Sequence, residues 1–436
     1  MATAPRPGYT QSVIRDRGDV ARVGLVTAGT RGDVQPLLAL GLELRRLGHE
    51  VRVFLNRSVA DWVREHGLPV TESGERAAGE VFAAAARRTT RLPWPVGAVV
   101  ELVRPKPGVR ESLDELERFA RDTDLVVCSE ASSLALHAAD ALRLPCVYVR
   151  FFPGWPSRQL PPPVCPLDDL GPRGNRLAHV AYSWLLGLSG GPDVNRWRGA
   201  RGLRRWSFTR YHQEIAARGW RVVVAVTRAL FEPPADWDPC VEQTGAWFLD
   251  EPGHTPAELL APAPLPRLLV SLGSNVGPRA ARVLELLRAT APLLPCRLVF
   301  TERAPTDAAR WGGDVTWIGP APHHLVLPHV AAVLHHAGAG TTAQVVRAAR
   351  PSATIPMHGE QRFWARRLAR RGLGPPPLDW RRATPRDLRE AVIQALDVPR
   401  WEAALTQAAT IVGQEPGAGC AQALVERALS ARREAS

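Results

Sequence analysis

The stretch that most constrains the fold lies in the C-terminal third of the chain. The apolar run Val330–Leu334 has the composition of a buried strand, and Thr342–Ala349 has the spacing of a helix. The residues between them are small, and Gly338 and Gly340 let the backbone come close to a bound group. Because the first N–H groups of a helix are unpaired and its N-terminal end is electropositive, this strand, turn and helix predict an anion site in an α/β fold.

Polar side chains extend the predicted anion site. Thr341 and Thr342 add hydroxyls at the start of the predicted helix. A second strand-like run, Ala353–Pro356, follows and brings Glu360 and Gln361 to the same edge of the sheet. A phosphate cradle with a carboxylate and an amide beside it suits a nucleotide that carries a polyhydroxylated group.

The order of these residues resembles the nucleotide-sugar signature of the GT-B glycosyltransferases, and more narrowly the sterol and antibiotic branch of the UDP-glycosyltransferase family. Members of this branch read approximately P-H-x-x-L-F-P, then A-A-V-V-H-H-G-G-A-G-T-T, then G-D-Q-x-F-W. The corresponding stretches here are Pro322–Pro328, Ala331–Thr342 and Gly359–Trp364. The chain departs from the family at Ala337, where Gly is usual, and at Gln344, where plant members place a ribose-binding Glu.

The resemblance implies an α/β GT-B fold, in which two Rossmann-like domains face each other across a cleft. It implies inverting transfer of a hexose from a UDP- or dTDP-sugar to a hydroxyl of a hydrophobic small molecule, such as a macrolide, a glycopeptide aglycone or a sterol. Bacterial antibiotic biosynthesis is the expected setting. No metal or other cofactor is implied, because the helix dipole and hydrogen bonds would hold the diphosphate.

The resemblance also assigns a donor site. His336 matches a histidine that contacts the donor diphosphate, and Ser274 matches a serine that lies against the donor phosphates. As a simpler alternative, Ser274 caps a helix that begins near Pro278. The predicted donor-binding residues are Ser274, His336, Gly338, Gly340, Thr341, Thr342, Glu360 and Gln361.

Length and Pro-rich segments divide the chain. At 436 residues it exceeds what one core usually supports, so two domains are expected. We predict a flexible leader (1–20), an acceptor-binding Rossmann-like domain (21–249), a linker (250–265), a nucleotide-sugar-binding Rossmann-like domain (266–400) and C-terminal helices (401–436). In relatives, the last helix crosses back onto the first domain.

The first β-α-β unit places a carboxylate at the edge of the N-terminal sheet. A buried strand over 21–27 leads into the loop Gly29–Asp33, and we predict a helix over Leu37–Leu47. Ligands bind at the C-terminal ends of parallel strands, so this loop points Asp33 into a cleft. The branch resembles this chain in having G-x-R-G-D here, which makes Asp33 the candidate catalytic base for the acceptor proton. Spacing alone favours the alternative that Asp33 caps the helix.

Three further side chains are predicted on the acceptor side. Arg31 shares the loop of Asp33, and Glu130 ends a strand that begins at Asp124. Glu130 could orient or tune Asp33, although a surface or capping role is the simpler interpretation. Trp155 belongs to a segment rich in Pro, Trp and Arg over 151–220, which we interpret as an apolar acceptor wall and not as a surface for single-stranded nucleic acid.

Composition bears on the remaining classes of function. The formal net charge is +12, but Lys106 is the only lysine and the arginines are scattered, so a nucleic-acid binder is the weakest interpretation. Six cysteines without CxxC spacing and the absence of a membrane-length apolar run predict a soluble cytoplasmic protein. Two alternatives stay open: a catalytically silent homologue that activates a partner glycosyltransferase, and a nucleotide-sugar epimerase. The oligomeric state cannot be inferred from the sequence.

Overall fold

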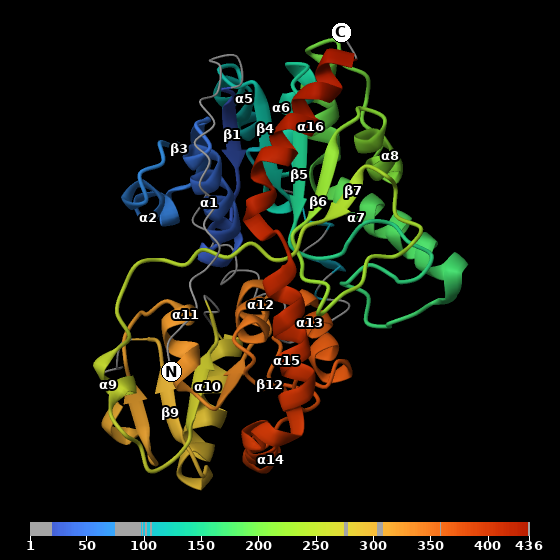
Figure 1. The fold of residues 1–436 in the computed structure, drawn as a ribbon. Helices are drawn as coiled ribbons and strands as arrows, with labels where there is room; N and C mark the ends of the chain where they lie inside the picture. The colour runs from blue at the N-terminus through green and yellow to red at the C-terminus, as the bar shows by residue number, and fades with distance from the viewer. Residues whose placement is uncertain are drawn as a thin grey trace.

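The computed structural model describes residues 20–74, 107–273, 278–302, 308–357 and 359–434, together with residues 97, 99, 100, 103 and 104. The predicted leader, except for Val20, and the predicted donor-site residue Ser274 lie outside the described residues. The described chain forms two parallel sheets surrounded by helices, one above the other in Figure 1.

The first sheet has seven parallel strands in the order β3-β2-β1-β4-β5-β6-β7. The strands are β1 (Arg22–Val26), β2 (Glu50–Asn56), β3 (Val70–Ser73), β4 (Leu125–Ser129), β5 (Cys146–Arg150), β6 (Arg221–Val224) and β7 (Val241–Gln243). The central strands β4 and β5 are buried along their whole length. Continuous buried runs of this kind are expected where helices cover both faces of a parallel sheet.

The helices of the first half include one that the sequence did not predict. They are α1 (Arg31–Arg46), α2 (Ala60–Glu65), α5 (Val109–Ala120), α6 (Ala135–Ala141), α7 (Gly171–Gly199) and α8 (Tyr211–Ala216). The 29-residue helix α7 lies within the segment that we interpreted only as an acceptor wall. Its several glycines and the internal Pro192 weaken any helix signal in the sequence.

The second sheet has five parallel strands in the order β10-β9-β8-β11-β12. The strands are β8 (Arg267–Ser271), β9 (Arg297–Phe300), β10 (Val315–Trp317), β11 (Ala332–His335) and β12 (Ser352–Thr354). The helices are α9 (Ala257–Leu260), α10 (Pro278–Thr290), α11 (His323–Val326), α12 (Ala339–Arg347), α13 (Gly359–Arg370), α14 (Pro385–Leu396), α15 (Val398–Gln414) and α16 (Ala421–Glu434). The short helix α9 lies inside the segment 250–265, which was predicted as a linker.

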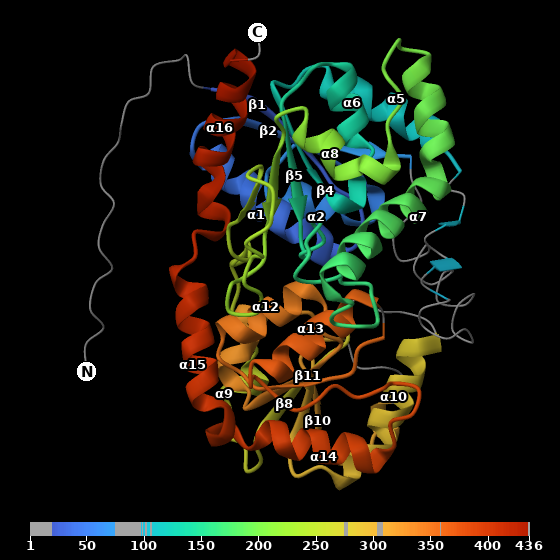
Figure 2. The same ribbon diagram turned by 90° about the vertical axis from the view of Figure 1, so that its right-hand side faces the viewer.

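The last two helices join the two halves of the molecule. Figure 2 shows α15 beside the second sheet and α16 continuing upward beside the first. Leu424 and Val425 of α16 are buried in the same apolar cluster as Leu25 of β1 and Leu40 of α1. The C-terminal segment therefore contributes to the core of the first domain.

Strand register brings the chemically important turns together. Val26 of β1 lies beside Cys128 of β4, and Ser129 lies beside Val149 of β5, so the residues that follow these strands share one edge of the first sheet. In the second sheet His335 lies beside Ser271 of β8, which brings the turns after β8 and β11 together. These C-terminal edges are where open α/β sheets bind ligands.

Two helices begin earlier than the sequence indicated. Helix α1 begins at Arg31 and not near Leu37, because Thr30 and Asp33 form a capping box that allows an earlier start. Helix α12 begins at Ala339 and not at Thr342, so the small residues of the turn already belong to the helix. In the part of the chain that the structure describes, no helix is long and apolar enough to cross a membrane.

Candidate active site

Asp33 is the third residue of α1, and its side chain folds back over the start of the helix. The backbone N–H of Thr30 donates to Asp33 Oδ2 over 2.7 Å, and the Thr30 hydroxyl lies 3.1 Å from the same oxygen. Gly29 has a φ of 118°, and a Cβ there would lie 2.3 Å from Oδ2, so the close packing requires glycine. Asp33 therefore caps the start of α1, as the alternative interpretation predicted. The hydrogen bonds from the described residues reach only Oδ2, and Oδ1 is left available.

The surroundings of Asp33 shift the pKa of its carboxyl. Burial raises the pKa of the Asp33 carboxyl, and the hydrogen bonds from Thr30 oppose this shift. Behind Asp33, the hydroxyls of Thr27 and Ser129 lie 3.1 Å apart and connect the ends of β1 and β4. A carboxylate with a raised pKa, held by a fixed helix start, suits proton transfer.

Glu130 and Arg150 form a pair at the same sheet edge. Glu130 begins a short 3-10 helix directly after β4, and Arg150 is the last residue of β5. Glu130 Oε2 and Arg150 Nε are 3.4 Å apart, and the Arg150 side chain is 5% exposed. Burial raises the pKa of Glu130 to about 8, against the attraction of Arg150 and with repulsion from Glu360 and Asp33.

Glu360 brings a third carboxylate from the second domain. It lies in the first turn of α13, and burial together with the negative charge of Asp33 raises its pKa to about 7. The negative charges of Glu360 and Asp33 also raise the pKa of Glu130. Gly32 of α1 and Gly340 of α12 line one cavity, so the two sheet edges face each other at this point. The neighbouring Gln361 accepts a hydrogen bond from the Met357 N–H over 2.8 Å, so its carbonyl oxygen already serves the start of α13.

The predicted anion site lies at the turn between β11 and α12. Gly338 is the N-cap of α12, and Gly338 and Thr341 are half-buried whereas Gly340 is exposed. The N–H groups of the first helical turn have no partner within the helix and can bind an anion. Ala337 has a φ of 62°, a conformation that favours glycine, and it therefore holds the turn in a strained geometry.

His336 packs between two glycines of this site. Its Nδ1 lies 3.2 Å from the carbonyl oxygen of Ser271, which fixes the ring. A Cβ on Gly338 would lie 2.4 Å from His336 Nε2, and one on Gly273 would lie 2.6 Å from Cε1. Burial lowers the pKa of His336 to about 4, so the ring is neutral near pH 7 and its Nδ1–H donates to Ser271.

The structure corrects the prediction for two site residues and gives a third, Arg31, partners that were not predicted. Thr342 is 0% exposed, because it lies on the buried face of α12, and its hydroxyl cannot reach a ligand in the cleft. Trp155 is 3% exposed and packs edge-on against His212 inside the first domain, so it is a core residue and not part of an open acceptor wall. Arg31 pairs with the linker carboxylate of Glu251 and stacks over Trp62, and its role toward an acceptor stays a prediction.

Arg150 and His323 were not singled out from the sequence as site residues. His323 Nε2 lies 3.3 Å from the Ser271 hydroxyl, and burial lowers the pKa of His323 to about 4, with His336 as the next cause. Arg150 could have been recognised as a charged residue at the end of an otherwise apolar central strand. For His323 the signal was the histidine of the P-H-x-x-L-F-P stretch, but its approach to Ser271 depends on tertiary packing.

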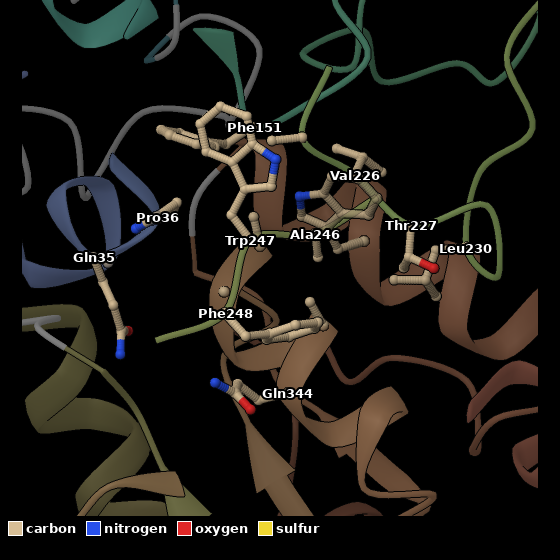
Figure 3. Close-up of a pocket in the computed structure, with 16 residues that line it drawn as sticks. Gln35, Pro36, Phe151, Val226, Thr227, Leu230, Ala246, Trp247, Phe248 and Gln344 are labelled. Carbon is tan, nitrogen blue, oxygen red and sulfur yellow. The ribbon is translucent and has the colours of Figure 1, made fainter. Parts of the chain in front are cut away.

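A cavity of about 50 Å³ lies beside the anion site, between the two domains. The aromatic rings of Phe151, Trp247 and Phe248 line it, and Gln344 of α12 closes one side (Figure 3). Gly340 of the predicted donor site is also in its wall. Within the described residues, the histidines, cysteines and carboxylates form no group of three that could hold a metal ion.

Comparisons with known sequences agree with this geometry. Residues 23–148 match the glycosyltransferase family 28 N-terminal domain. The O-mycaminosyltylonolide 6-deoxyallosyltransferase of Streptomyces fradiae is 29% identical over 429 residues, which cover 93% of this chain and 97% of that protein. A sterol 3-beta-glucosyltransferase of Eremothecium gossypii is 27% identical over 375 residues, which cover 80% of this chain but only 30% of that longer protein.

A solved structure shows the same fold. The glycosyltransferase VinC, crystallised in complex with dTDP, superposes with a TM-score of 0.65 and 19% identity over 95% of this chain and 100% of its own. Both parallel sheets are thus arranged as in a GT-B protein, which confirms the fold class predicted from the sequence. With its family 28 N-terminal domain, its GT-B fold and its glycosyltransferase relatives, this chain is a glycosyltransferase.

Proposed function

We propose that this protein transfers a hexose from a UDP- or dTDP-sugar to a hydroxyl of a hydrophobic natural product or sterol, with inversion at the anomeric carbon. The names of the two relatives support this class of acceptor, and the dTDP in VinC supports a nucleoside diphosphate donor. The single observation that carries the proposal is that the starts of two helices from opposite domains share one cavity, since it is lined by Gly32 of α1, next to Asp33, and by Gly340 of α12.

In this reaction Asp33 is the catalytic base. The acceptor oxygen attacks the anomeric carbon from the face opposite the diphosphate, and its proton moves to Asp33 Oδ1. As the new C–O bond forms, the bond from the anomeric carbon to the diphosphate oxygen breaks, and its electron pair leaves with the nucleoside diphosphate. The hydrogen bonds from Thr30 hold Oδ2, which keeps Oδ1 in a fixed position for the proton.

The start of α12 binds the leaving diphosphate in our proposal. The unpaired N–H groups around Gly340 and Thr341 face the charge that develops on the leaving oxygen. His336 Nδ1–H already donates to Ser271, so His336 Nε2 must take up a proton before it can donate to a phosphate oxygen. A bound diphosphate favours this protonation because it places negative charge next to the ring.

The remaining polar side chains orient the two substrates. Glu360, with the amide of Gln361, binds sugar hydroxyls at the start of α13. Glu130 and Arg150 lie on the acceptor side, where their pairing holds the Glu130 carboxyl near Asp33. The six cysteines are all free thiols, which supports our placement of the reaction in the cytoplasm.

The substitution Asp33→Asn tests the assignment of the base. Asn can still accept the Thr30 hydrogen bonds, so we expect unchanged stabilisation by UDP or dTDP in a thermal-shift assay. Release of nucleoside diphosphate in the presence of acceptor should fall about 1,000-fold, because the proton acceptor is lost. Asp61→Asn, at a side chain that is 91% exposed in α2, serves as the control and should transfer normally. Full activity of Asp33→Asn would remove Asp33 as base.

The same measurements separate the two alternatives. A catalytically silent partner of another glycosyltransferase would show no release of nucleoside diphosphate with any acceptor. A nucleotide-sugar epimerase would interconvert sugars without an acceptor. The presence of Asp33 and Glu360 in one site supports the transferase over the silent homologue.

A further inference from the structure

Helix α7 carries an exposed apolar face that the transfer reaction does not require. Leu177, Val180, Trp184 and Leu188 are 68%, 40%, 50% and 44% exposed. Their spacing of three and four residues places them in one row along the helix. Between Arg176 and Asp193 the sequence contains no Asp, Glu, Lys or Arg. We call these four residues the outer face of α7, and Figure 2 shows the helix along the outside of the first domain.

Positive charge adjoins one end of the outer face. Arg158, Arg173 and Arg176 line a surface groove of about 560 Å³, together with Leu177 and Val180. All three arginine residues are exposed. Among the described residues, neither Arg173 nor Arg176 forms an ion pair with a carboxylate.

The nearest carboxylates in the sequence do not neutralise this charge. Asp168 pairs with Arg366 and Arg370 of α13, on the other domain. Asp169 accepts hydrogen bonds from Asn175 and from the Gly171 N–H. The groove therefore presents arginine side chains beside an apolar row.

The opposite side of α7 is buried in the first domain. His179 and Ser183 are buried, and His179 bonds to the carbonyl oxygen of Leu160 through Nε2. Burial lowers the pKa of His179 to about 4, and the charge of Arg150 is a smaller cause in the same direction. Burial raises the pKa of Tyr182 to about 12, against the charge of Arg150. One helix thus connects the exposed apolar row with the acceptor side of the site.

We propose that the outer face of α7 docks the protein onto a membrane surface that contains anionic lipids. In such a complex the row from Leu177 to Leu188 enters the boundary between headgroups and acyl chains, and Trp184 lies at the level of the headgroups. Arg173 and Arg176 bind lipid phosphates. The helix lies on the bilayer and does not cross it, in agreement with the absence of a membrane-spanning helix from the described residues.

A second copy of the chain fits this surface less well. In a twofold dimer the same patch lies on both partners, so the Arg173 and Arg176 side chains of two copies would approach each other without a carboxylate between them. An anionic bilayer matches both the apolar row and the positive charge. This inference goes beyond the proposed transfer reaction and does not depend on it.

Vesicle co-sedimentation of the full-length protein tests the proposal. We expect the protein to sediment with vesicles made of phosphatidylcholine and about 30% phosphatidylserine. It should bind vesicles of pure phosphatidylcholine much less. The double variant R173Q/R176Q should lower the partition coefficient about 25-fold, at about fivefold for each arginine. Trp184→Ala should lower it roughly tenfold through the loss of buried apolar area.

Matched controls come from exposed sites on the second domain. Leu293→Ala removes an apolar side chain that is 53% exposed, and R282Q/R382Q removes two exposed arginines. Both should bind vesicles like the original protein, and all variants should keep its melting temperature.

Two results would overturn the proposal. One is failure of the unmodified protein to bind either kind of vesicle. The other is a concentration-dependent dimer in analytical ultracentrifugation that Trp184→Ala abolishes, because the outer face would then be an interface between copies. Neither measurement depends on transfer activity. The docking proposal and the proposed function can therefore fail separately.

Discussion

In our proposal, the side chain of Asp33 serves both the fold and the reaction. Its Oδ2 caps α1 through Thr30, and this bond fixes the carboxyl relative to the end of β1. The capping alternative and the catalytic assignment therefore do not compete, because a cap that engages one oxygen orients the other. A loop residue without this bond would lose more entropy on reaching the same position.

The pH dependence of stability provides a test of the Glu360 environment. Its pKa rises from 4.5 to about 7 on folding, so the native state binds more protons than the unfolded state between these values. Stability contributed by the neutral carboxyl is therefore lost as pH rises through about 7. We expect Glu360→Gln to raise Tm by about 2 °C at pH 8 and by much less at pH 4. Differential scanning calorimetry at the two pH values measures this, with exposed Glu258→Gln as the control.

His336 predicts a coupling between donor binding and proton uptake. Its pKa of about 4 in the free protein should rise when a diphosphate binds, so affinity should increase as pH falls through the bound-state pKa and level off below about 4. Titration calorimetry with dTDP or UDP in buffers of different ionisation enthalpy counts the protons. His336→Ala should abolish the uptake and weaken binding about tenfold, whereas exposed His254→Ala should change neither. Uptake that persists in His336→Ala would assign it to another group.

At the scale of elements, the unit formed by β11, the turn and α12 carries the proposed donor site. The strand is buried, the turn contains the strained Ala337, and the helix begins at Ala339 with its first N–H groups unpaired. His336 fits between Gly273 and Gly338 because neither has a side chain. The glycines of this unit therefore have different roles, which substitution can separate.

Three glycine substitutions test these roles. Gly338→Ala should weaken dTDP or UDP binding at least tenfold, because its methyl group would lie 2.4 Å from His336 Nε2 and displace the ring. At Gly340 an added Cβ meets nothing within 4 Å, so Gly340→Ala should keep the stability of the protein. It should lower donor affinity, because the proposed diphosphate binds at this helix start and the added methyl group would lie against it. Gly413→Ala in α15 also has open space and should leave both unchanged. Isothermal titration and thermal unfolding distinguish the three outcomes.

At the scale of the whole molecule, two adjacent linker carboxylates attach to opposite domains. Asp250 binds Arg347 of α12 over 2.6 Å, and Glu251 accepts a hydrogen bond from Trp62 Nε1 over 2.8 Å and pairs with Arg31. The chain between the domains is thus fastened to the donor helix on one side and to the start of α1 on the other.

Removal of these linker contacts should loosen the chain between the domains. The double variant D250N/E251Q should be cut by a protease within 250–265 about fivefold faster, because opening each contact then costs less free energy. Glu390→Gln breaks an ion pair inside α14 and is the control. Mass spectrometry of the fragments identifies the site, and equal cleavage rates in both variants would show that the contacts do not restrain the linker.

Much of the fold and part of the site could be predicted from the sequence. The buried strands, the small residues before α12 and the carboxylates at strand ends are local patterns, and the edge of a parallel sheet brings their chemistry together. The prediction was wrong for Thr342 and Trp155 because burial of a helix face or of a loop tryptophan depends on distant residues that pack against it. The pairing of Arg31 could not be predicted, because its partner Glu251 lies 220 positions away.

The sequence by itself therefore determined the α/β architecture, the anion-binding turn and the position of Asp33, since these follow from backbone geometry and short-range spacing. Only the tertiary structure decided which side chains reach the cleft. It paired Arg150 with Glu130, buried Thr342, and left the outer face of α7 uncovered. The physical reason is that exposure, ion pairing and a shifted pKa all depend on what surrounds a group in space, and the surroundings are assembled from segments far apart in the chain.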